Sequence, residues 1–105
     1  NNPLPEQAAQ ACGDAAGKID LPVVALPVLN ALKNTWAMKQ LRRSDHAAFW
    51  SYNLPGMMIT DSSNFRNPNY HCLNGTNDSV ATLDHAFATK VIKATVASVV
   101  EMLRN

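Results

Sequence analysis

The expected fold class is decided by residues 53–60, which read NLPGMMIT. Asn53, Pro55 and Gly56 are turn formers, so the chain is expected to change direction here. The following residues, Met57 to Thr60, form a short run that is apolar on both faces of an extended chain. That pattern is typical of a strand buried in a parallel sheet. The run therefore predicts a strand that enters a sheet directly after a turn.

Further elements are expected on the N-terminal side of this turn. Ser44 suits the N-cap of a helix that ends at Tyr52. Residues 28–43 have no clear period and predict a loop with a helical turn around 32–36. Residues 23–26, VVAL, lie between two prolines and predict a short strand at a sheet edge. Residues 5–17 begin with Pro, are rich in Ala and end with Gly, which predicts a helix.

The clearest element is a C-terminal helix, with Thr82 or Asp84 as its N-cap and its end near Arg104. One face of this helix carries apolar residues at helical spacing, and this face is expected to be buried. These residues are Ala88, Ile92, Val96, Val99 and Leu103, with Phe87, Val91 and Met102 beside them. A polar connection over residues 61–83 precedes the helix, and connections of this length are often functional.

The order of these elements predicts one α/β segment over residues 1–105. Two short strands make a poor sheet on their own, so the segment is expected to be part of a larger layered domain with a mostly parallel central sheet. The long C-terminal helix is expected to cover that sheet.

Composition and charge place the chain among folded globular proteins. Hydrophobic residues make up 47% and charged residues 16%. The net charge is +1 and the one basic doublet is Arg42-Arg43, which argues against a nucleic-acid partner. No apolar stretch approaches the roughly 20 residues of a membrane span. The chain begins Asn1-Asn2-Pro3 without Met or a leader-like segment, as a processed or truncated chain would.

Two cysteines, Cys12 and Cys72, leave two possibilities open. They form one disulfide if the protein is secreted, or they remain free thiols. Free thiols are favoured because no disulfide framework is visible.

Three histidines are the first candidates for chemistry. His46 lies near the start of a predicted helix, His71 follows Tyr70 in the long connection, and His85 opens the last helix. The chain contains no His-Glu-x-x-His motif and no Cys-x-x-Cys motif. A lone histidine is most often an ordinary polar residue, so spacing alone assigns no function to any of the three.

Four blocks of sequence, taken in order, indicate a specific function. They are RSDHAAFW at 43–50, LPGMMITD at 54–61, FRNPNYH at 65–71 and TLD at 82–84. Together they closely resemble the C-terminal part of the dizinc (co-catalytic zinc) aminopeptidases of clan MH, a family related to glutamate carboxypeptidase and glutaminyl cyclase. The resemblance covers roughly residues 21–104. It implies a three-layer αβα zinc-exopeptidase fold (phosphorylase/hydrolase-like) and favours an extracellular or periplasmic location.

The resemblance implies a metal ligand and catalytic residues. His71 matches the last zinc-binding histidine of the family. Tyr70 matches a tyrosine that in some members hydrogen-bonds the oxyanion of the tetrahedral intermediate. Asp45 belongs to a pair beside the metal centre and is expected to act with Tyr70 in catalysis.

The resemblance also implies a surrounding set of orienting residues. Asp45 and His46 match the pair beside the metal centre, whose expected role is hydrogen bonding to the ligands. Arg66 and Asn67 match the loop that presents His71. After His71 the chain departs from the family, because CLNGTNDS stands where Thr-Pro-x-Asp-Thr is common. The pocket wall beside the metal is therefore expected to differ.

Most of the family's metal site has no counterpart in this chain. The family uses two zinc ions held by an upstream histidine, a bridging aspartate, paired glutamates and a further acid. Here the two glutamates, Glu6 and Glu101, do not adjoin another acid, and His71 is the one matching ligand. The resemblance therefore implies a peptide substrate, and an upstream half of the same catalytic domain as a separate chain or as missing sequence. The chain alone is expected to be inactive.

A second interpretation is a non-catalytic half-domain that acts as an assembly or partner-binding module. Its buried-looking strands would then be covered by another copy or by another polypeptide. A third is a plain structural domain in which the four blocks arose by chance, which the order of the blocks argues against.

Overall fold

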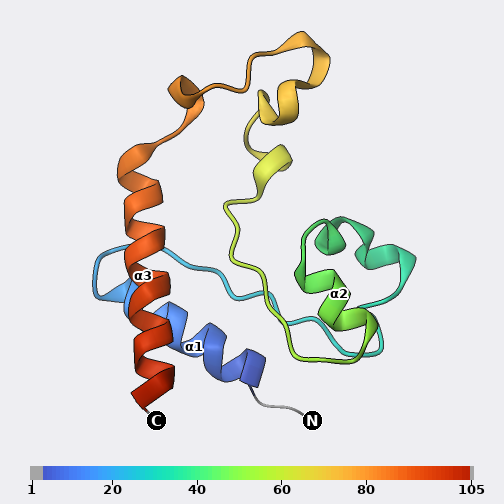
Figure 1. Ribbon diagram of the computed structural model, residues 1–105, viewed down its shortest axis with the longest axis vertical. Helices are drawn as coiled ribbons and strands as arrows, with labels where there is room; N and C mark the ends of the chain where they lie inside the picture. Colours follow the sequence, from blue (N-terminus) through green and yellow to red (C-terminus); the bar gives the residue numbers. More distant parts are fainter. Residues whose placement is uncertain (1–3, 105) are drawn as a thin grey trace.

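The regular elements of the computed structural model, which describes residues 4–104, are all helical. The α-helices are α1 (Leu4–Gly17), α2 (His46–Ser51) and α3 (His85–Arg104), and four 3-10 helices connect them (Figure 1). These are η1 (Trp36–Arg42), η2 (Ser63–Phe65), η3 (Tyr70–Gly75) and η4 (Val80–Thr82). Residues 1–3, on which the expectation of a processed or truncated start was based, lie outside the described residues.

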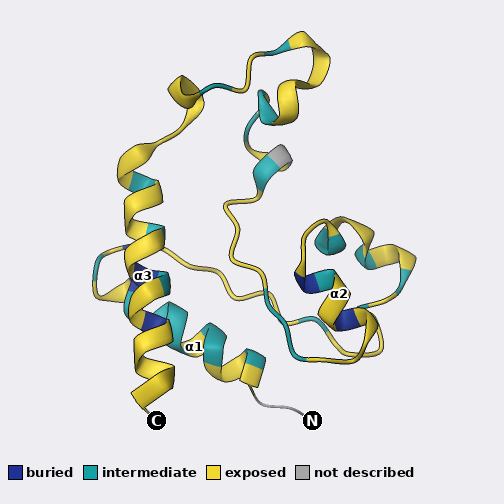
Figure 2. Cartoon of the chain, viewed as in Figure 1, coloured by how far each residue is buried: buried dark blue, intermediate teal, exposed yellow. Residues whose placement is uncertain are grey.

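Helices α1 and α3 pack against each other and bury the apolar core (Figure 2). Ala16, Leu21 and Ala94 form the buried cluster, and Ile19 and Phe87 pack against it. The alanines allow the two backbones to approach closely, because there is little side chain between them. The helix predicted over residues 5–17 is thus confirmed, and its apolar side contributes to the core.

Helix α3 begins where its sequence predicted. The Phe87 backbone N–H donates to Asp84 Oδ1 at 2.9 Å, which makes Asp84 the capping residue. The buried face overlaps the predicted one only at its margin, where Phe87 and Val91 pack against the core. Ala94 and Ser98 are buried against α1, whereas Leu103, on the predicted face, is 82% exposed. Ile92, Val96 and Val99 are exposed with it, so α3 is apolar on two faces and α1 packs on the face with the smaller side chains.

The α2 unit, residues 33–57, forms a second packed region apart from α1 and α3 (Figure 1). Trp50 is its buried centre, and its indole Nε1–H donates to the Gly56 carbonyl at 2.8 Å. A Cβ at Gly56 would lie 3.2 Å from the Phe49 Cβ, so glycine permits the close return of the chain after the turn. The helix begins at His46 with Asp45 as its N-cap, and the predicted cap, Ser44, precedes it.

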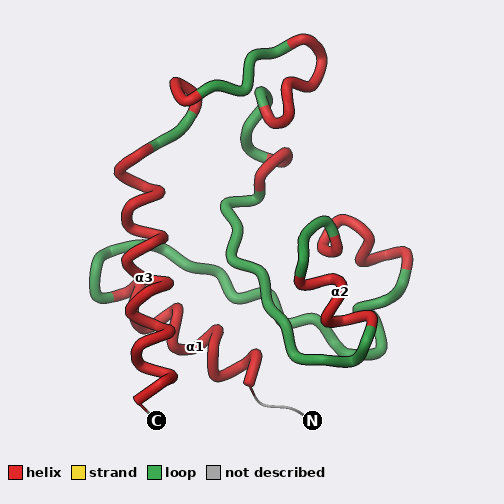
Figure 3. The backbone as a smooth tube through the Cα atoms, in the orientation of Figure 1, coloured by secondary structure: helices red, strands yellow, loops and turns green. Residues whose placement is uncertain are grey.

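No strand forms between residues 4 and 104, so the predicted α/β class with a parallel central sheet is wrong. Residues 23–26 and 57–60 lie in loops, as Figure 3 shows, and make no backbone hydrogen bond to one another or to any other described segment. An extended segment becomes a strand only when a neighbour pairs with its N–H and C=O groups. Pro22 and Pro27 also remove donors at both ends of the first segment. Val24 therefore lies 91% exposed rather than in a sheet.

The connection over residues 61–84 leads from the α2 side of the molecule to the start of α3 (Figure 1). It contains three short 3-10 helices, with no buried residue in η3 or η4. None of the described helices is long and apolar enough to cross a membrane.

Candidate functional site

Tyr70 and His71 are stacked at the start of η3. Their ring centroids are 4.1 Å apart and the ring planes differ by 9°. The preceding turn is built by Asn67, whose side-chain oxygen accepts from the Asn69 N–H at 2.9 Å while its carbonyl accepts from the Tyr70 N–H at 3.2 Å. The His71 backbone N–H donates to Asp78 Oδ2 at 2.8 Å. The local sequence thus places both rings by hydrogen bonds within one loop.

The backbone after Tyr70 adopts an uncommon conformation. His71, Cys72 and Asn74 have φ values of 53°, 56° and 56°, in the left-handed region. This region costs a residue other than glycine about 1–2 kcal/mol. Strain of this kind persists where surrounding contacts require it, and it is frequent at functional sites. Here the contacts that hold it include the Asp78 carboxylate and the bond from Thr76 Oγ1 to the Leu73 carbonyl at 2.7 Å.

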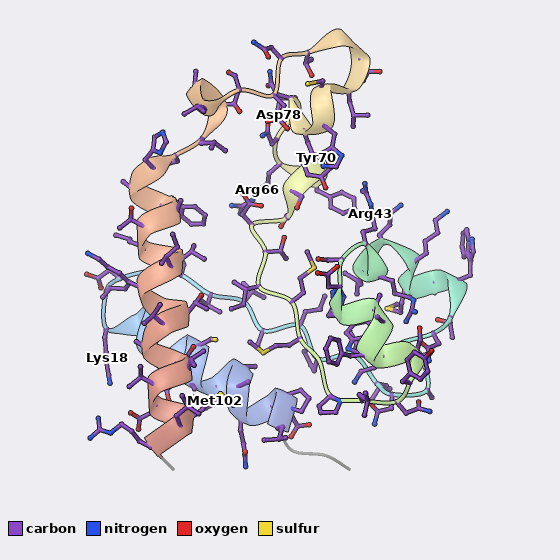
Figure 4. The ribbon with its side chains drawn as sticks, in the orientation of Figure 1. Lys18, Arg43, Arg66, Tyr70, Asp78 and Met102 are labelled. Atoms are coloured by element: carbon purple, nitrogen blue, oxygen red, sulfur yellow. The ribbon has the colours of Figure 1, made fainter. Side chains whose placement is uncertain are left out.

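A cation from the α2 unit reaches this loop. The Arg43 guanidinium carbon lies 5.8 Å from the centroid of the Tyr70 ring. Figure 4 shows Arg43 and Tyr70 approaching each other from separate segments, with Asp78 on the loop beyond Tyr70. The first residue of block 43–50 and the last two residues of block 65–71 are therefore brought together.

His46 lies inside the α2 unit rather than beside His71. It is 7% exposed, and its ring meets Trp50 edge to face with 4.7 Å between centroids. Nε2 hydrogen-bonds the Leu41 carbonyl, so in the neutral ring Nε2 carries the proton and Nδ1 is an acceptor. Nδ1 is buried and has no hydrogen-bond partner among the described residues. A buried histidine that packs against an aromatic ring in this way fits a packing role.

Asp45 is exposed and, with His46, lines a shallow hollow of about 270 Å³. The other lining residues are Phe49, Pro55, Gly56 and Met57. The hollow is largely apolar and lies between α2 and the extended segment after the turn. It contains neither Tyr70 nor His71. The predicted site residues are thus divided between this hollow and the Tyr70 loop.

Arg66 and Asn67 lie on the approach to the loop. Arg66 is exposed, and its backbone N–H donates to the Ser63 carbonyl at 3.1 Å to close the preceding turn. Asn67 is half-buried and organises the turn before Tyr70. His85, at the start of α3, is exposed and away from this loop.

The described residues do not form a complete zinc site. No group of three or more His, Cys, Asp or Glu side chains among them could hold a metal ion. The His71 imidazole has the chemistry of a zinc ligand, because it is exposed and neither ring nitrogen hydrogen-bonds another described residue. Cys12 and Cys72 are both free thiols, and Cys12 is engaged at the α1–α3 contact.

Comparison of the chain with protein-family models, with curated proteins and with solved structures gave no match.

Sequence patterns assigned no role to Arg43, which lies against the Tyr70 ring, or to Asp78, which accepts from the His71 backbone N–H. Arg43 begins the first resembling block, but its contact with Tyr70 joins distant segments and no local pattern indicates it. Asp78 lies in the polar stretch after His71, where an acceptor for a backbone N–H is a common use of Asp. The polar composition of this stretch is the sequence signal that could have indicated the role of Asp78.

Proposed function

We propose that this chain forms part of a zinc-dependent exopeptidase that removes N-terminal residues from peptides. In this proposal His71 is one zinc ligand and Tyr70 is a hydrogen-bond donor to the reacting group. The observation that carries it is the stack of the half-buried Tyr70 ring on the exposed His71 ring at 4.1 Å, with the Arg43 guanidinium near the Tyr70 ring. The family resemblance assigns blocks 43–50 and 65–71 to a single centre, and this stack is where they meet.

Bound zinc would polarise the scissile carbonyl and lower the pKa of a bound water. The residues of this chain have separate tasks. The His71 ring would offer a nitrogen as the ligand atom, and Asp78 fixes the backbone from which that ring projects. The Tyr70 hydroxyl donates to the oxyanion that forms on the scissile carbonyl, and a donor of this kind is worth about 2.7–4 kcal/mol. Asp45 is proposed to orient ligands from the α2 side.

The remaining metal ligands and the general base are proposed to come from polypeptide outside these 105 residues. Glu6 and Glu101 lie on α1 and α3, away from the Tyr70 loop, and neither adjoins a second acid. A peptide substrate would therefore bind between this chain and that further polypeptide.

The test uses the natural gene product that contains this sequence. Zinc content is measured by elemental analysis, and hydrolysis is measured on a panel of aminoacyl-p-nitroanilides. We expect His71→Ala to lose bound zinc and hydrolysis together, because a ligand is removed. Tyr70→Phe should keep its zinc and lose about 10²–10³ in kcat, as on removal of an oxyanion donor.

His85→Ala is the matched control, because His85 is exposed on α3 and outside the stack. It should leave zinc content and hydrolysis unchanged. Retention of both zinc and activity in His71→Ala, or a natural gene product that binds no zinc at all, would contradict the proposal.

A second candidate function, a non-catalytic assembly module, is favoured by the exposed face of α3. Ile92, Val96, Val99 and Leu103 are between 50% and 82% exposed. Their spacing of four, three and four residues is that of a seam between paired helices, so the proposed occupant is α3 of a second copy. A concentration-dependent, metal-free dimer that Val99→Lys dissociates, from a gene product without hydrolytic activity, would favour this candidate.

A further inference from the structure

We infer that Arg43 is a positioning residue for Tyr70, an inference that rests on the proposed function. The Tyr70 ring contacts two other planar groups, the His71 imidazole at 4.1 Å and the Arg43 guanidinium at 5.8 Å. A guanidinium within about 6 Å of a ring centroid is attracted to the electron-rich face of the ring. The contact therefore favours one orientation of the ring that carries the Tyr70 hydroxyl.

Arg43 projects from a well-anchored part of the chain. The preceding residue, Arg42, donates to the Lys33 carbonyl at 3.1 Å, to the Asn34 side-chain oxygen, to the Ala47 carbonyl at 3.3 Å and to Ser51 Oγ at 2.7 Å. These bonds join the segment before α2 to both ends of that helix. The backbone next to Arg43 is consequently fixed in the α2 unit.

The Tyr70 loop, by contrast, is held mainly by bonds within itself. The Asn69 side chain donates to the Asn77 carbonyl at 3.0 Å, and Thr76 Oγ1, which donates to the Leu73 carbonyl, also lies 3.3 Å from the Pro68 carbonyl. No residue of η3 is buried, so apolar packing contributes little to its position. The Arg43–Tyr70 contact is a bridge between this loop and the α2 unit.

Position matters here because the proposed role of Tyr70 depends on where its hydroxyl lies. A donor acts on an oxyanion at hydrogen-bond distance, and a misplacement of about 1 Å can cost about 10² in rate. Arg43 acts through the Tyr70 ring and is not assigned a contact with the reacting atoms. Lysine would keep the charge but lose the flat guanidinium that lies over the ring.

A double-mutant cycle in the natural gene product tests this role. Arg43→Ala should lower kcat by about 2- to 5-fold, the loss expected for an exposed cation–ring contact, with KM and zinc content unchanged. In the Tyr70→Phe background the same substitution should have no further effect, because the hydroxyl that Arg43 positions is already gone. Arg43→Lys should recover part of the loss.

Hydrogen exchange gives a readout that does not depend on activity. Backbone amides over residues 67–78 should exchange faster in Arg43→Ala, because the loop loses its bridge to α2. Lys39→Ala is the matched control: the Lys39 ammonium lies 4.8 Å from the exposed Trp36 ring, a contact of the same kind outside the site. It should change neither exchange over 67–78 nor kcat.

The outcomes separate the two proposals. Unchanged exchange over 67–78 in Arg43→Ala overturns the positioning role, whatever the activity. Equal kcat losses from Arg43→Ala with and without the Tyr70→Phe substitution, or a rise in KM alone, also overturn it, because Arg43 would then act on substrate directly. The proposed exopeptidase function would be contradicted by a different result, namely hydrolysis and zinc content that His71→Ala leaves unchanged.

Discussion

The α1–α3 pair and the α2 unit are held together in different ways. Between α1 and α3, small residues such as Ala16 and Ala94 bring two backbones close, and a polar contact, from Cys12 Sγ to Ser98 Oγ at 3.2 Å, crosses the interface. The α2 unit instead surrounds one large side chain, Trp50, and is tied by the many hydrogen bonds of Arg42.

This difference indicates a division of tasks. Close packing of small residues is non-directional, and it stabilises the pair without setting the position of any one polar atom. A guanidinium with several fixed acceptors is directional, because its donors point along a planar fork. Arg43 and Asp45, the residues proposed to position Tyr70 and to orient the metal ligands, belong to the directional unit.

The largest expected effect is in the α2 unit, at Trp50. Trp50→Ala removes a buried ring, its edge-to-face contact with His46 and its bond to Gly56, and should lower the free energy of unfolding by about 3–5 kcal/mol. Urea unfolding followed by far-UV circular dichroism measures this. Trp36→Ala, at a position 79% exposed, should change it by less than about 0.5 kcal/mol. Similar losses in both variants would show that Trp50 is not a packing centre.

The next effect tests whether Arg42 holds the α2 unit by its fork. Arg42→Met keeps much of the side-chain volume but removes every donor, and should lower the free energy of unfolding by about 2 kcal/mol. Arg42→Lys keeps the charge with one donor group and should lie between Met and the natural protein. If Arg42→Lys has the same free energy of unfolding as the natural protein, the charge of Arg42 and not its fork geometry stabilises the α2 unit.

Overpacking probes the α1–α3 contact. Ala94→Leu adds a larger side chain where the helices meet, and should lower the free energy of unfolding by about 1–3 kcal/mol. Ala97→Leu, on the exposed side of the same helix, matches it in chemistry and should have little effect. A neutral Ala94→Leu would mean that α1 and α3 are not in close contact in solution.

The smallest effect concerns the side-chain hydrogen bond from Cys12 on α1 to Ser98 on α3. Ser98→Ala removes the acceptor of the Cys12 thiol and the donor to the Thr95 carbonyl, and should cost about 1 kcal/mol. Thr89→Ala removes an exposed hydroxyl bonded to the His85 carbonyl and serves as its control, with a change within about 0.5 kcal/mol. Equal changes in the two variants would show that the bond between Cys12 and Ser98 stabilises the protein no more than an exposed one.

Local signals predicted the helices, and non-local pairing explains the errors. Asp84 as a cap and Gly17 as a helix end act within one turn, so α1 and α3 could be located from sequence. The segments 23–26 and 57–60 were expected to be strands because of their composition, but strand formation requires a partner that composition does not supply. The periodicity of α3 fits two faces, and it does not reveal which one α1 covers.

The same distinction applies to the candidate site. Tyr70 and His71 are adjacent in sequence, so their proximity was predictable, although their stacking depends on left-handed backbone at His71. The Arg43 contact comes from a distant segment, and no periodicity encodes it. His46 was expected beside the metal, and the structure places it against Trp50 because its ring fills the interior of the α2 unit. Its role as an orienting residue stays a prediction.

The exposed Cys72 thiol, next to His71, affects how the protein must be handled. An accessible free thiol reacts with a second one under oxidising conditions, and no buried partner inside the described part of this chain competes for it. Preparations left in air would therefore accumulate covalent dimers joined beside the Tyr70 loop. Such a linkage would crowd that loop. A dimer that disappears on addition of reducing agent, or in a Cys72→Ser variant, is a product of oxidation in storage and not of association between folded chains.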